Sequence, residues 1–113
     1  MSIAYVTLAV VTITANLGIA VADFARAKFV LANAAEVNVP QAWLPTLGAL
    51  KAAGSAGLLL GLLGVPAVGR MAAAGLVLFF VGAVVAHVRA RAYGKIAFPG
   101  LFLALAIATF TLT

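Results

Sequence analysis

The chain has 113 residues, of which 66% are hydrophobic and only 8% are charged. A soluble domain of this size carries about 25% charged residues, so the composition excludes an ordinary soluble domain and favours an integral membrane protein with short loops. The length accommodates about four membrane spans of roughly 20 residues each. We therefore expect an all-α, four-helix membrane bundle that forms a single domain over residues 1–113.

The net charge is +5, and the chain has no cysteine. In a soluble protein this charge would suggest nucleic-acid binding. In a membrane protein, lysine and arginine collect in cytoplasmic loops and meet anionic lipid headgroups, so lipids rather than nucleic acid are the expected partners. The lack of cysteine excludes disulfides, thiolate metal sites and a thiol–disulfide relay within the chain.

The first span is expected at about residues 3–22, and it can continue as helix to about residue 30. The N-terminus lacks the basic region and cleavage site of a signal peptide, so this span should be retained. Arg26 lies one turn beyond Asp23 and can pair with it. Polar residues in a span need partners inside the bundle, and four of them share one narrow arc of this helix: Tyr5, Thr12, Asn16 and Asp23.

Residues 31–46 form the longest connection in the chain. Pro40 and Pro45 interrupt any helix there, because proline lacks the backbone donor and disfavours helix just before it. Trp43, between them, suits the membrane interface. Two interpretations remain open, an anchored loop and a short lid over a pocket.

The second span is expected at about residues 47–65. Small residues let two helices approach closely, so a glycine stripe on this span is a packing surface, either within one subunit or between subunits. The stripe contains Gly54, Gly57, Gly61 and Gly64. Lys51 lies beside it, with Ser55 one turn above, and this lysine either extends to the headgroups or turns inward and pairs with Asp23.

A tight turn at residues 64–69 leads into the third span, at about residues 71–88, and a basic turn at residues 90–95 leads into the fourth, at about residues 96–112. Gly75 and Gly82 are expected to form the packing stripe of the third span. On the helical wheel, Phe80, His87 and Arg91 fall on one face of it.

Four spans would place both termini on one side of the membrane, together with the turn at residues 64–69. The only cation on that side would be Arg70. The opposite side would hold five cations, Arg26, Lys28, Arg89, Arg91 and Lys95. The positive-inside rule then predicts extracytoplasmic termini in a multi-pass protein of the cell membrane.

Three ionisable residues from different spans, Asp23, Lys51 and His87, are expected at one depth near the cytoplasmic end. They are either unrelated interfacial residues or the polar part of a ligand pocket with apolar walls. In the second case they are also the candidate catalytic residues. The full set of candidate ligand-binding residues is Asn16, Asp23, Trp43, Lys51, Ser55, Phe80, His87 and Arg91. One histidine and two acids, spread widely, do not predict a metal site.

The segments LPTLGALKAAGSAGLLLGL and GRMAAAGLVLFFVGAVVAHVRAR resemble the DoxX-like family of small bacterial four-helix membrane proteins. The features that carry the resemblance are Lys51 with Gly54 and Gly57, and the third span ending in His87 and Arg89. The resemblance implies a bacterial inner-membrane protein, associated in some relatives with thiosulfate:quinone oxidation or with a membrane redox complex, and in distant animal relatives with receptor assembly. It makes a quinone or another flat lipophile a plausible ligand, with Lys51 and His87 as the positions to test.

Several functions therefore remain open. The first is a membrane subunit that binds a quinone-like lipophile, with Lys51 and His87 donating hydrogen bonds or protons to its oxygens. The second is a scaffold that assembles with itself or with a membrane complex through the glycine stripes. A proton-transfer or isomerase enzyme acting on a lipophile is a further alternative. A transporter ranks last, because Asn16 is uncharged where small multidrug transporters need a carboxylate deep in the first span.

Overall fold

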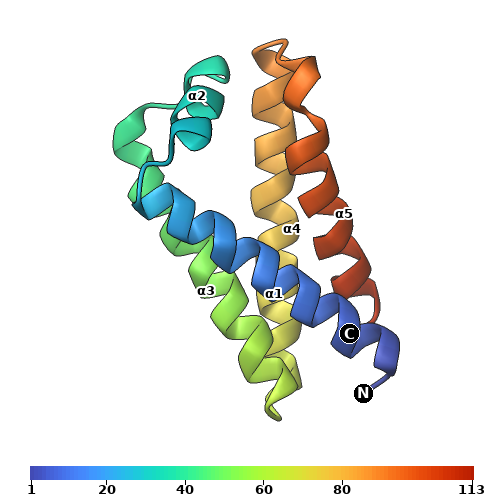
Figure 1. Ribbon diagram of the computed structural model, residues 1–113. Helices are drawn as coiled ribbons and strands as arrows, with labels where there is room; N and C mark the ends of the chain where they lie inside the picture. Colours follow the sequence, from blue (N-terminus) through green and yellow to red (C-terminus); the bar gives the residue numbers. More distant parts are fainter.

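A computed structural model describes all residues 1–113 and shows an all-helical protein without strands. The five α-helices are α1 (Ile3–Phe24), α2 (Lys28–Glu36), α3 (Leu44–Leu62), α4 (Pro66–Arg89) and α5 (Ala97–Thr111), with short 3₁₀ turns η1 (Gln41–Trp43) and η2 (Tyr93–Lys95). The four longer helices lie side by side, while α2 sits at one end of them, opposite both chain termini (Figure 1). The fold class is therefore all-α, as expected.

The first helix ends earlier than the sequence suggested. Instead of continuing to Val30, α1 ends at Phe24, and the chain reverses through Arg26, whose φ is +52°. The backbone N–H of Ala27 donates to Ala22 O at 3.0 Å, and that of Arg26 donates to Asp23 O at 3.2 Å. These two bonds are the Schellman arrangement that closes a helix C-terminus, here without glycine. Arg26 is exposed and makes no ion pair, so its expected pairing with Asp23 is wrong.

The same closure recurs at the ends of three other helices. Asn38 after α2 (φ +62°), Gly64 after α3 (φ +120°) and Arg91 after α4 (φ +56°) each adopt the left-handed region. Only one of these positions is a glycine, the residue that normally marks such an end. The turn after α3 is also shorter than residues 64–69, because α4 begins at Pro66, whose missing N–H costs little in a first helical turn.

The polar arc of α1 faces inward, as predicted. Tyr5, Thr12, Asn16 and Asp23 are all buried. The apolar core lies beside this arc between α3, α4 and α5, where Leu58, Ala73, Leu76, Phe80, Phe102 and Ala106 form one cluster. One long face of α1 is polar and buried. The interior is therefore divided into an apolar region and a polar column, which consists of this face of α1 and the polar side chains packed beside it.

The glycine stripe of α3 packs against α4 of the same chain. A Cβ placed on Gly57 would lie 2.6 Å from Ala72 Cβ, and one on Gly61 would lie 2.7 Å from the backbone of Gly69. At these two positions the stripe is therefore an internal packing surface, whereas Gly64 lies beyond the end of α3 and a Cβ there would meet nothing within 4 Å. Gly75 and Gly82 of α4 behave differently, since a Cβ there would meet nothing within 4 Å. The expectation that they form a close packing stripe is wrong.

Two of the helices, α1 and α4, are long and apolar enough to cross a membrane by length and composition. The third longer helix, α3, has 19 residues, and α5 is an apolar helix of 15 residues. Both pack along the first two, since α3 contacts α1 and α4, and α5 contacts α4 and α1.

Replacing Gly61 with alanine should lower the melting temperature in detergent, because the added Cβ meets backbone that cannot rotate away. Overpacking of this kind costs about 1–3 kcal/mol. The matched control is Gly18→Ala on the exposed face of α1, where a Cβ meets nothing within 4 Å. The control should keep or raise the melting temperature, since alanine is the better helix former by about 1 kcal/mol. Equal melting temperatures for the two variants would contradict the packing described here.

Candidate functional site

A cavity of about 430 Å³ lies at the end of the molecule where α2 sits. All five α-helices contribute to its wall, and 14 of its 20 lining residues are hydrophobic. The cavity is partly open to the outside. Its polar lining residues are few, namely Asp23, Lys51, Asn33 and His87, so the site combines apolar walls with a small number of polar groups, which is the usual form of a small-molecule site.

The strongest electrostatic feature of the cavity is an ion pair between α1 and α3. Lys51 Nζ lies 2.7 Å from Asp23 Oδ2. Both residues are buried, with only 8% of Lys51 and 2% of Asp23 exposed. Lys51 therefore turns inward and does not extend to the headgroups. An unpaired charge in this position would be costly, so each residue holds the other in the interior.

The protein leaves part of the hydrogen-bonding capacity of Lys51 unused. An ammonium group has three N–H donors, and the only hydrogen bond that Nζ makes is to Asp23 Oδ2. Nζ also lies 5.4 Å from the centre of the Phe79 ring, within the range of a cation–π contact. The ammonium is therefore held at the cavity wall with donors free to meet an oxygen of a bound molecule.

His87 forms the second polar point, near the end of α4. Its Nδ1 lies 2.8 Å from Ala83 O, and its Nε2 lies 3.1 Å from Asn33 Oδ1. A carbonyl only accepts, so Nδ1 carries a proton. If the ring is neutral, Nε2 accepts from the amide NH₂ of Asn33 after that amide turns over; if the ring is cationic, Nε2 donates to the amide oxygen. Either arrangement ties α4 to α2.

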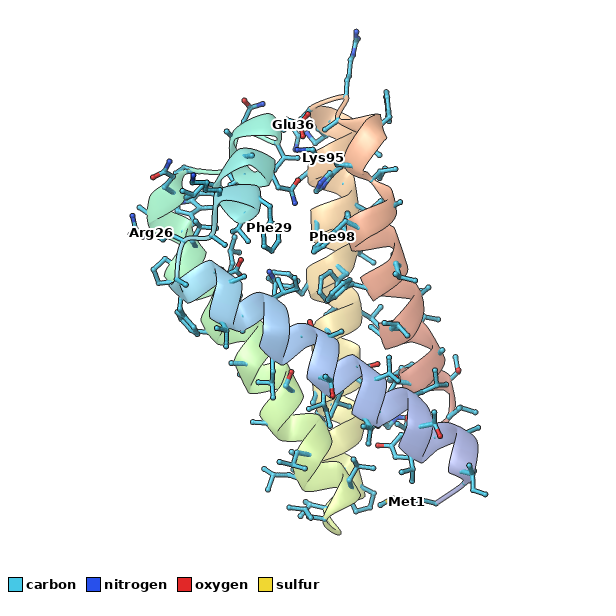
Figure 2. All side chains as sticks on the ribbon, in the orientation of Figure 1. Met1, Arg26, Phe29, Glu36, Lys95 and Phe98 are labelled. Atoms are coloured by element: carbon cyan, nitrogen blue, oxygen red, sulfur yellow. The ribbon has the colours of Figure 1, made fainter.

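A second link also fastens α2 to the rest of the molecule. Lys95 Nζ, at the end of η2, lies 3.1 Å from Glu36 Oε2, at the end of α2, and both side chains are about half exposed, at 48% each. Figure 2 shows this pair where α2 meets the start of α5, with Arg26 on the other side of α2. Residues 31–46, which were interpreted as either an anchored loop or a lid, include the C-terminal part of α2. This helix covers one end of the cavity.

The structure brings five of the predicted site residues to the cavity: Asp23, Trp43, Lys51, Phe80 and His87. The other three lie elsewhere. Asn16 and Ser55 are buried in the polar column, where Asn16 Nδ2 donates to Thr12 O at 2.9 Å and Ser55 Oγ donates to Lys51 O at 3.0 Å. Arg91 is exposed beyond the end of α4, because the left-handed turn at this residue takes it off the face that carries His87.

The lining residues that sequence reasoning missed include one polar residue, Asn33, and two aromatic residues, Phe79 and Phe98. Asn33 was missed because α2 was expected to be part of a connection. Phe98 stacks on Phe102 with ring centres 5.1 Å apart and also lines the cavity. The pair Phe79-Phe80 was a usable signal, since adjacent aromatic residues on a helix can flank one site from two directions, and here both line the cavity.

A protein-family model, that of the DoxX-like family, matches residues 7–109. The matched range includes every residue that lines the cavity. No curated protein and no solved structure matches the chain.

Replacing Asp23 with asparagine should strongly destabilise the protein, because it leaves the Lys51 ammonium buried without a carboxylate. Breaking a buried pair on one side costs about 3–5 kcal/mol. The double variant Asp23→Asn, Lys51→Met should recover much of this loss, since no charge then remains uncompensated. Thermal unfolding of the three proteins in one detergent measures the effect.

The matched control is Glu36→Gln, which removes one carboxylate from the exposed pair. We expect a loss below about 1 kcal/mol, because exposed ion pairs contribute little. A double variant as unstable as Asp23→Asn alone would show that the two residues do not stabilise each other.

Proposed function

Because the chain belongs to the DoxX-like family, we propose that it is a small multi-pass membrane protein that binds an uncharged, quinone-like lipophile in the cavity beside Asp23 and Lys51. The observation that carries this proposal is the placement of a compensated ion pair and a fixed histidine in an otherwise apolar cavity. A bound redox-active ligand of this kind would make the protein part of a membrane redox system.

The membrane topology is part of the proposal. Helices α1, α3, α4 and α5 are assigned as four spans, with α2 and η1 at the cytoplasmic interface and both termini outside. Support comes from the charges, since Arg70 is the only lysine or arginine near the end that holds the termini and Arg26, Lys28, Arg89, Arg91 and Lys95 belong to the opposite end. This is the positive-inside distribution.

The charge of the ligand follows from the charges in the wall. Asp23 and Lys51 compensate each other at 2.7 Å, so the pair offers no net charge to a bound ion. Burying a charged ligand in such a cavity would carry the large cost of an uncompensated charge. An uncharged molecule with carbonyl or hydroxyl oxygens avoids that cost and still meets the free donors of Lys51.

The residues have distinct roles in this proposal. Lys51 donates a hydrogen bond to one ligand oxygen, and Asp23 orients the ammonium. His87 supplies a second polar group and, with Asn33, holds α2 over the site. The rings of Phe79, Phe80 and Phe98 provide flat apolar surfaces for a flat ligand. Reduction of a bound quinone to the quinol would take two electrons, which a partner redox enzyme would have to supply, and two protons, for which Lys51 and His87 are the candidate donors in the cavity wall.

The scaffold function keeps only part of the observation that suggested it, because Gly75 and Gly82 of α4 are uncovered whereas the glycines of α3 are not. Gly57 and Gly61 contact α4 of the same chain, so they cannot also pack against a second protein in this arrangement. The ligand-binding proposal is therefore the one that the geometry supports best.

The chain contains an internal reporter for this proposal, because Trp43 is its only tryptophan and lines the cavity. Quinones quench tryptophan fluorescence on contact. Titrating the purified protein with a short-chain benzoquinone should quench Trp43 saturably, and an excess of a non-quenching phenol of similar shape should restore the fluorescence.

Gly82→Leu should weaken this binding roughly tenfold or more, because its side chain would occupy the cavity and overlap the ligand. The fold should tolerate the change, since a Cβ on Gly82 meets nothing within 4 Å. The control Gly18→Leu places the same side chain on the exposed face of α1 and should bind as the unaltered protein does. Linear, unsaturable quenching that is identical in all three proteins would overturn the proposed function.

A second measurement does not presuppose the ligand. Extracting the protein in mild detergent and identifying retained small molecules by mass spectrometry should show a lipophile with the unaltered protein and with Gly18→Leu. The same molecule should be missing from His87→Ala and from Gly82→Leu. Retention by all four proteins, or only bulk phospholipid in each of them, would count against a specific site.

A further inference from the structure

A second hollow, a groove of about 610 Å³, runs along the outside of the molecule between α3 and α4. None of its 11 lining residues has a charged, hydroxyl or amide side chain. On α3 they include Leu50, Gly54 and Gly57, which are spaced as one helical face. On α4 they include Met71 and Gly75. The groove is therefore a continuous apolar channel parallel to the two helices.

The floor and the edges of the groove are formed by different structural features. The floor is the close contact of α3 with α4, where Gly54 lies against Leu76 and Gly57 lies against Ala72. The edges are large exposed side chains, with Leu78 73% exposed and Met71 72% exposed. Gly75 keeps the channel open between them, because a Cβ at this position would meet nothing within 4 Å.

The groove and the cavity adjoin each other. Three residues, Leu50, Leu78 and Phe79, line both. Phe79 stands at the junction, with its ring 5.4 Å from Lys51 Nζ. The boundary that these three residues form between the two hollows is apolar, and the groove lies on the outer surface that the membrane proposal exposes to lipid.

We infer that the groove holds the aliphatic tail of the ligand whose head occupies the cavity, so that the natural ligand is a long-chain prenyl or alkyl lipophile that enters from the bilayer between α3 and α4. This inference rests on the proposed function for the head and extends it to the tail. The cavity volume of about 430 Å³ lies toward the lower part of the range of about 300–1,000 Å³ for small-molecule sites. It suits a ring system, and a long chain attached to that ring must leave through an apolar opening.

The physical role of the groove is to direct the tail. Lipid chains are as apolar as leucine, so moving a tail from the bilayer into the groove gains little hydrophobic energy. The gain comes from van der Waals contact along a shaped surface, and from allowing the head to enter without folding the chain back into the small cavity. Filling the groove should therefore harm long-chain ligands and spare short ones.

The test uses a benzoquinone with a decyl chain that ends in a photoreactive diazirine, added to the protein in lipid nanodiscs. After illumination, peptide mapping should find adducts on groove residues of α3 and α4, such as Ala53 and Met71. Gly75→Leu should reduce these adducts roughly tenfold, because the new side chain fills the channel. Gly18→Leu should leave them unchanged. Adducts confined to α1 or α5, or equal groove labelling in all three proteins, would overturn the inference.

A second readout separates this inference from the proposed function. Quenching of Trp43 by the same quinone without a chain reports the head alone. Gly75→Leu should leave this quenching intact and weaken only the decyl compound, whereas Gly82→Leu should weaken both. Loss of both ligands in Gly75→Leu would overturn the tail assignment while leaving the head site standing. Quenching that fails in the unaltered protein would reject the head site, even where the chain still labels the groove.

Discussion

The structure depends on the ion pair between Asp23 and Lys51. A charge in the interior of a helical membrane protein is expensive unless it is compensated, and the two residues come from different helices, 28 positions apart in sequence. The pair therefore fixes how α1 and α3 lie against each other near one end of the molecule. Because Lys51 is held there by one oxygen, its remaining donors are kept at the wall of the cavity. The same pair that compensates the buried charges thus supplies the main polar groups of the cavity wall.

The shape of the cavity depends on where α1 and α4 end. Left-handed turns at Arg26 and Arg91 close α1 and α4. The first turn redirects the chain so that α2 lies across the end of the bundle, and the second leads into η2, whose Lys95 meets Glu36 of α2. A non-glycine residue in this conformation costs roughly 1–2 kcal/mol. The surrounding hydrogen bonds and the two links from α2 offset that strain.

Glycine has two opposite uses in this protein. At Gly57 and Gly61 the missing side chain lets α3 and α4 touch, and the contact at Gly57 forms part of the floor of the outer groove. At Gly75 and Gly82 the missing side chain leaves space, in the groove and in the cavity respectively. Each pair lies on one face of its helix by spacing, so the position of the neighbouring helix decides which use applies.

The helical class, the approximate positions of the longer helices and the inward face of α1 could be predicted from the sequence, because they follow from local composition and from the helical repeat. The sequence also identified Asp23, Lys51 and His87 as the residues to examine. It did not determine that Lys51 pairs with Asp23 rather than reaching the surface, since both outcomes satisfy the same local chemistry. Only the tertiary structure decided this, and it also added α2 and Asn33 to the site and removed Arg91. Such outcomes depend on where the chain reverses, and a left-handed turn at an arginine leaves no mark in the sequence.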